Sequence, residues 1–202
     1  YGNAYEKSEL FELFSFDQLL KNYDLSFDEI ESGWVDGKDD GGIDGLFLFV
    51  DEAFIAEKPT SKKIRNEPLI ELVVITCKYG DSFRQDPVTN LLSTIPEFLD
   101  LAKNNDELTA EYNDEILSVR ELFKETYIEL AVKNPKLKVT YIYSSRGDAD
   151  QIPENIKSRS ALLISQTEKF FSNAVSVFQY VGAAELLQLY RTKKNYSLRL
   201  KF

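Results

Sequence analysis

An aspartate and a lysine at the ends of two apolar segments are the residues of this chain best placed to do chemistry. Asp44 closes a glycine-rich turn and is followed at once by the apolar run 46–50. Lys78 closes the run 69–78, in which Glu71 is the only other charged residue. Carboxylate oxygens are ligands that Mg²⁺ prefers, and a lysine can hold a water or neutralise charge on a phosphate. The pair is therefore the candidate site of this chain, with Asp44 as a possible Mg²⁺ ligand and Lys78 as a group that could act on a phosphate.

The turn before Asp44 also has a purely structural explanation. Residues 34–45 contain four glycines and four aspartates. Glycines let a backbone bend tightly and leave room for a substrate, but solvated acids in a turn, with a lysine ending a nearby strand, would have the same sequence. A calcium loop of the EF-hand kind starting at Asp36 is excluded, because its third position is Lys38 and its twelfth is Phe47. The phosphate-binding P-loop is excluded as well, since no Gly-Lys-Ser/Thr ends the turn.

Composition removes several classes of function. The 202 residues contain no histidine, which excludes Ser-His-Asp and Cys-His catalysis and any histidine-ligated zinc. The single cysteine excludes a disulfide framework and favours a reducing, cytoplasmic compartment. No apolar run approaches the ~20 residues that span a bilayer, so no membrane partner is expected. The net charge of −10 argues against nucleic-acid binding, unless a local basic surface or a bound cation offsets it.

The order of the predicted elements indicates an α/β domain. Hydrophobic periodicity predicts helices over 5–22, 27–32, 87–103, 106–133, 153–171 and 182–191, and strands over 46–50, 54–56, 69–78, 137–143, 175–181 and 196–202. Strands that alternate with helices favour a mixed sheet with helices on its faces. We expect one domain over 1–202, and a chain that starts at Tyr1 without any methionine suggests a fragment of a longer protein.

Three local features of this pattern carry alternatives. Ser26 could cap the helix over 27–32, although an acidic loop would also fit. Pro96 predicts a kink or a break in the helix over 87–103. The basic cluster 62–65 could contact phosphates, but a solvated loop is the preferred explanation.

The stretch Asp39-Asp40-Gly41-Gly42-Ile43-Asp44-Gly45, followed by apolar strands and then Cys77-Lys78, resembles a known family. It is similar to the amino-terminal domain of the AIPR (abortive infection phage resistance) proteins. More broadly it resembles the Mrr branch of the PD-(D/E)XK restriction-endonuclease-like nucleases. In that pattern the aspartate after Gly-Ile binds Mg²⁺ and matches Asp44, and the lysine of the third strand matches Lys78. Thr76 stands where the family has an acid or a glutamine.

Two further segments extend the resemblance over most of the chain. Phe11-Glu12 matches a Phe-Glu pair in the family's first helix, whose glutamate reaches the metal. From spacing alone, the preferred interpretation of Glu12 is a helix-surface acid beside Glu9. The stretch 178–187 looks similar to the end of the same domain. For Cys77 only the backbone carbonyl is implied as a metal ligand, and its side chain is expected to be a small buried hydrophobe.

The resemblance implies a three-layer α/β/α domain of the restriction-endonuclease-like fold with a central mixed sheet. It implies an endonuclease of phage defence in which Asp44, Glu12 and the Cys77 carbonyl hold Mg²⁺ or Mn²⁺ and Lys78 assists the reaction. The implied partner is nucleic acid, DNA in the first place, and a homodimer is left open. Thr76 puts a second metal in doubt, so the alternative is a degraded binding or assembly module of the same fold. A third reading is a structural domain whose function lies in a missing part of the protein.

Overall fold

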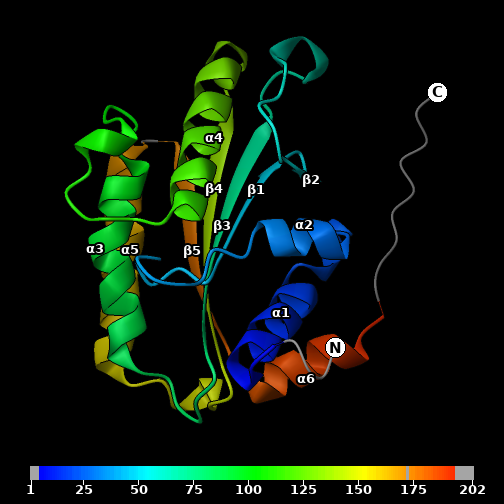
Figure 1. Ribbon diagram of the computed structural model, residues 1–202, viewed down its shortest axis with the longest axis vertical. Coiled ribbons are helices and arrows are strands. Elements are labelled where there is room, and N and C mark those ends of the chain that lie inside the picture. The colour runs from blue at the N-terminus through cyan, green and yellow to red at the C-terminus, as the bar shows by residue number, and fades with distance from the viewer. Residues whose placement is uncertain (1–4, 172, 194–202) are drawn as a thin grey trace.

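The structure is a computed structural model that describes residues 5–171 and 173–193, and its centre is a five-stranded sheet (Figure 1). The strands are β1 (Gly45–Val50), β2 (Ala53–Phe54), β3 (Leu69–Lys78), β4 (Lys136–Ser145) and β5 (Ala174–Val181). Their order across the sheet is β2-β1-β3-β4-β5. β1 runs antiparallel to β2 and β3, whereas β3, β4 and β5 are parallel to one another. The predicted mixed sheet is therefore confirmed.

Helices cover both faces of this sheet, so the described chain forms three layers (Figure 1). They are α1 (Lys7–Leu19), α2 (Phe27–Ser32), α3 (Gln85–Leu99), α4 (Asp114–Leu130), α5 (Glu154–Phe170) and α6 (Ala183–Arg191). Short 3₁₀ turns lie at Lys21–Tyr23, Ser61–Lys63, Asn105–Glu107, Ala131–Lys133 and Ala149–Gln151. One core joins α3, α4 and α5 to the sheet, and a second joins α1, α2 and α6 to its opposite face. A smaller cluster packs Phe83, Val88, Tyr143, Ile152 and Ile156 together.

The central strands are buried on both sides because both of their faces carry apolar residues. Every residue of β1 is buried. Leu46 and Leu48 pack into the core beneath α3 and α4, whereas Phe47 and Phe49 pack into the core beneath α1 and α2. Such strands cannot shift by one residue without exchanging the two sets of side chains. The packing therefore fixes the register in which Gly45 lies opposite Ile75.

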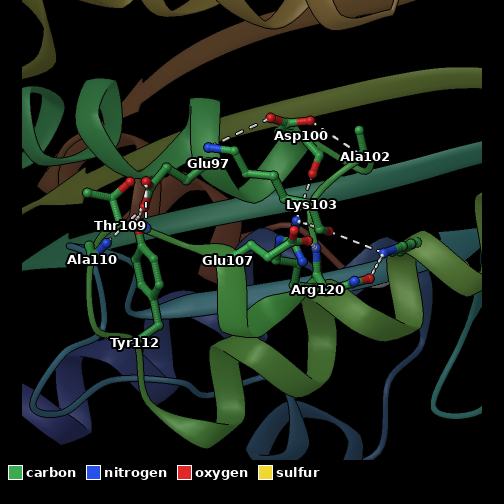
Figure 2. Close-up of polar contacts among 11 residues, drawn as sticks. Glu97, Asp100, Ala102, Lys103, Glu107, Thr109, Ala110, Tyr112 and Arg120 are labelled. Atoms are coloured by element: carbon green, nitrogen blue, oxygen red, sulfur yellow. Dashed lines mark hydrogen bonds and ion pairs between the residues drawn. The ribbon is translucent and has the colours of Figure 1, made fainter.

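The predicted helix over 106–133 is wrong in its first part, because α4 begins only at Asp114. Figure 2 shows the reason, which is the connection between α3 and α4. The buried Arg120 donates to the backbone carbonyls of Asp100 (2.7 Å) and Lys103 (3.0 Å). Glu97 accepts hydrogen bonds from the backbone and hydroxyl groups of residues 109–112. These bonds hold residues 100–113 in a connection whose only helical part is the 3₁₀ turn at Asn105–Glu107.

Several other predictions about the helices can be checked directly. The Ser26 side chain does cap α2, accepting from the Glu29 amide, so the helical reading is confirmed. The helix over 87–103 is shorter, from Gln85 to Leu99, and it continues through Pro96 without ending there. The strand predicted over 196–202 lies outside the described residues. Among the helices that are described, none is long and apolar enough to cross a membrane.

Candidate metal centre

Asp44 is the fully buried residue around which the candidate site is arranged. Its backbone amide donates to the Ile75 carbonyl (3.0 Å), which extends the antiparallel pairing of β1 with β3 by one residue. Its carboxylate Oδ2 accepts from the Thr76 hydroxyl (3.2 Å) and from the Cys77 amide. The carboxylate is 0% exposed. The end of β3 therefore holds the Asp44 side chain in one orientation.

The Lys78 ammonium lies beside the Asp44 carboxylate, on its solvent side. Its Nζ is 3.3 Å from Oδ1 and 3.4 Å from Oδ2 of Asp44. The Lys78 side chain is 46% exposed, so it reaches solvent while it pairs with a carboxylate that does not. The sequence placed this acid and this lysine at two neighbouring strand ends, and the two groups do meet there. The lysine is thus positioned between the buried acid and anything that approaches from solvent.

Glu12 comes to the same pocket from α1. Its side chain is only 6% exposed, so the reading of a surface acid is wrong. The Trp34 indole donates to Glu12 Oε2 at 2.9 Å and orients the carboxylate. One helical turn further on, Phe16 packs so closely on Gly45 that an added Cβ there would meet its ring at 2.7 Å. This close approach of α1 to the start of β1 brings Glu12 beside Asp44.

Asp36 is the third carboxylate of the site and was missed by the sequence analysis. Single carboxylate oxygens of Glu12, Asp36 and Asp44 all lie within 4.8 Å of one another. Its neighbour Val35 is fully buried in the core, so Asp36 points to another side of the chain, but that burial is set by tertiary packing and gives no signal in the sequence. The other acids of the turn do not join this group: Asp39 pairs with Lys38, and Asp40 accepts from the Gly42 amide (2.6 Å).

The glycine-rich turn is fixed against α3. Gly41 and Gly42 have positive φ angles of 63° and 82°, which glycine adopts without strain. A Cβ on Gly42 would lie 2.7 Å from the Asn90 Cβ, and one on Gly41 would lie 2.7 Å from the Thr94 side chain. The Thr94 hydroxyl donates to the Gly41 carbonyl (2.7 Å). The turn that delivers Asp44 is therefore supported by a helix.

Thr76 is buried and its hydroxyl donates to Asp44, so it supports that carboxylate. The Cys77 side chain is buried in the apolar core, as expected, and burial raises the pKa of its thiol. A role for the Cys77 carbonyl as a metal ligand stays a prediction. The basic cluster 62–65 precedes β3 at the end opposite Lys78, and Arg65 pairs there with Asp51. That cluster is not part of the site.

The electrostatics of the pocket favour a cation. Burial raises the pKa of Glu12 to about 8, and the negative charge of Asp44 adds to this shift. Burial also raises the pKa of Asp44 to about 7, although the Lys78 ammonium opposes the shift. Glu12 and Asp44 are buried and Asp36 is exposed beside them. Three carboxylates this close together repel one another, and a divalent ion with a preference for oxygen donors would relieve that repulsion. The donor set thus fits Mg²⁺ or Mn²⁺.

Comparison of the chain with models of protein families, with curated proteins and with solved structures found no match. The functional interpretation of the site therefore depends on its own geometry.

The stability of the protein should depend on pH and on metal together. Without metal, the raised pKa values mean that the folded state retains protons that the unfolded chain loses, from about pH 4 to 7 for Asp44 and to about 8 for Glu12. Stability should therefore fall as pH rises through this window. Mn²⁺ needs ionised carboxylates, so it should raise Tm more at pH 8 than at pH 6. At pH 8, and at a hundred times the Kd measured at that pH, the rise in Tm should be about 5–10 °C.

Thermal melts of the wild type and of Asp36→Asn, with Mn²⁺ and with EDTA, measure this effect. Removal of one ligand should reduce the Mn²⁺-induced rise in Tm to about half or less. Asp39→Asn is the matched control, because Asp39 lies in the same turn, outside the group of three carboxylates. An equal rise at both pH values, or an undiminished rise in Asp36→Asn, would contradict the metal centre.

Proposed function

We propose that this chain is a metal-dependent nuclease domain of the restriction-endonuclease-like fold that cleaves nucleic acid, DNA in the first place, in phage defence. One observation carries the proposal: carboxylates from α1, from the turn and from the start of β1 converge, with the Lys78 ammonium in contact with the Asp44 carboxylate. The strand order and the antiparallel β1–β3 pair followed by parallel strands agree with the proposed fold.

Each residue has a role that its position allows. Glu12, Asp36 and Asp44 would hold Mg²⁺ or Mn²⁺, together with the Cys77 carbonyl. When bound, the ion supplies Lewis-acid polarisation of the phosphate and a lower pKa for water. Lys78, the half-exposed cation at the pocket mouth, would orient the attacking water and neutralise charge that builds on the phosphate in the transition state.

Asp36 can supply the carboxylate that is missing at position 76. The family pattern has an acid or a glutamine there, and here Thr76 is bonded to Asp44. In this chain Asp36 brings a carboxylate to the same group from the neighbouring turn. We therefore favour a site with one metal ion whose third carboxylate comes from a different segment.

The alternative is a binding or assembly module of the same fold that has lost cleavage. Thr76 and the net charge of −10 favour it. Nicking of supercoiled plasmid and cleavage of labelled oligonucleotides, with Mg²⁺, Mn²⁺ or EDTA, separate the two. The proposal predicts products only with a divalent ion, and it fails if pure protein at micromolar concentration gives none with either ion.

A further inference from the structure

A cleft beside the candidate metal centre has no role in the site described so far. It has a volume of about 430 Å³ and runs from Lys78 along the following loop to the first turns of α3, where Arg84, Asp86 and Asn90 line it. Lys78 thus belongs both to the carboxylate pocket and to this cleft. A polymer that places one phosphate at Lys78 would continue into the cleft.

The loop between β3 and α3 is held firmly for an exposed segment. The Ser145 hydroxyl donates to the Gly80 carbonyl (3.0 Å) and to the Ser82 carbonyl (3.4 Å). The Arg84 amide donates to the hydroxyl of the buried Tyr143 (3.0 Å). Gly147 packs against the loop so closely that an added Cβ would lie 2.8 Å from the Ser82 Cα. The cleft wall is therefore formed before any ligand arrives.

The lining of the cleft includes an exposed arginine, Arg84. Arg65 and Arg146 are engaged by Asp51 and Asp81. Arg84 is exposed, and its guanidinium makes no ion pair with a carboxylate of residues 5–171 or 173–193. It also sits at the N-cap of α3, where no side chain caps the helix. The cleft thus presents two cations, Lys78 and Arg84, against one carboxylate, Asp86.

We propose that the Lys78–Asn90 cleft binds the phosphodiester chain next to the scissile bond, with Arg84 as the residue that contacts a flanking phosphate. This inference rests on the proposed nuclease function and names its substrate-binding path. Arginine suits this task because its fork of donors matches the oxygens of a phosphate. Arg84 is a substrate-binding residue, since it would contact a flanking phosphate directly and lies beyond the metal centre.

Binding of fluorescein-labelled single-stranded DNA and RNA oligonucleotides tests the inference through fluorescence anisotropy. Measurements in Ca²⁺, over a series of salt concentrations, compare the wild type with Arg84→Ala and with Arg65→Ala at the opposite end of the sheet. Arg84→Ala should weaken binding about 5-fold or more at low salt and reduce the slope of log K against log salt by about 0.7, the value for one lost phosphate contact. Arg65→Ala should leave both quantities unchanged.

The outcomes separate this inference from the nuclease proposal. If binding depends on Arg84 but the protein does not cleave, the inference about the cleft is supported and the nuclease proposal is contradicted. If the protein cleaves but Arg84→Ala has unchanged affinity and salt slope, the inference about the cleft is contradicted and the nuclease proposal stands. A wild-type protein that binds neither the DNA nor the RNA oligonucleotide would overturn the inference that this cleft binds a phosphodiester chain. The oligonucleotide that binds more tightly shows whether the cleft prefers DNA or RNA.

Discussion

Asp44→Asn is expected to lower metal-dependent cleavage by about 10³-fold or more while the protein remains folded. Asparagine has the shape of aspartate and can still accept from the Cys77 amide, so the turn and β3 stay in place. It cannot supply the charge that a divalent ion needs. Loss of activity without loss of structure is the expected signature of a ligand.

The stability of Asp44→Asn gives the same variant a second readout. Burial raises the pKa of Asp44 to about 7, so above that pH the folded protein carries an unfavourable buried charge. Without metal at pH 8, Asp44→Asn should therefore melt no lower than the wild type. With Mn²⁺ the wild type should gain stability and the variant should not.

Asp39→Asn is the control for both readouts, because Asp39 is exposed in the same turn and has a positive φ that asparagine tolerates. It should retain wild-type cleavage and the wild-type response to metal. Cleavage by Asp44→Asn at more than a tenth of the wild-type rate would show that Asp44 does not hold a catalytic ion.

Lys78→Ala is expected to reduce the cleavage rate by about 10²–10³-fold and to leave the metal in place. The ammonium lies within 3.4 Å of both Asp44 oxygens and is half exposed, so it can reach a phosphate bound at the same pocket. It is not itself a ligand. The rise in Tm with Mn²⁺ should therefore persist in this variant.

The pH–rate profile of Lys78→Ala should shift in a direction that can be checked. The positive charge of Lys78 lowers the pKa of Asp44, so its loss should raise that pKa further. The ascending limb of the pH–rate profile should move to higher pH. Lys63→Ala, an exposed lysine in the cluster far from the site, serves as the control. Equal rates for Lys78→Ala and the wild type would contradict the nuclease proposal.

The sequence was sufficient to place Asp44 and Lys78 because both positions follow from local pattern. Each residue stands at an end of a strongly apolar run, and short apolar runs bounded by turn residues are typical of strands buried on both faces. The two strands pair in the sheet, so their ends meet. Local rules were enough for this half of the site.

Glu12 and Asp36 depend on tertiary packing, which periodicity alone does not report. Glu12 is buried because the close contact of Phe16 with Gly45 seats α1 against the start of β1. The family resemblance of Phe11-Glu12 pointed to Glu12, whereas the helical pattern around Glu9 gives no sign of that contact. The late start of α4 has a similar cause, because the buried Arg120 binds loop carbonyls that lie 17 and 20 residues before it.

Anomalous X-ray scattering from crystals soaked in Mn²⁺ tests the central claim most directly. The account predicts one strong manganese peak at about 2.1 Å from carboxylate oxygens of Glu12, Asp36 and Asp44. The peak should be absent from crystals of Asp44→Asn. A wild-type crystal without a peak at these three carboxylates, at an Mn²⁺ concentration that supports cleavage, would contradict it.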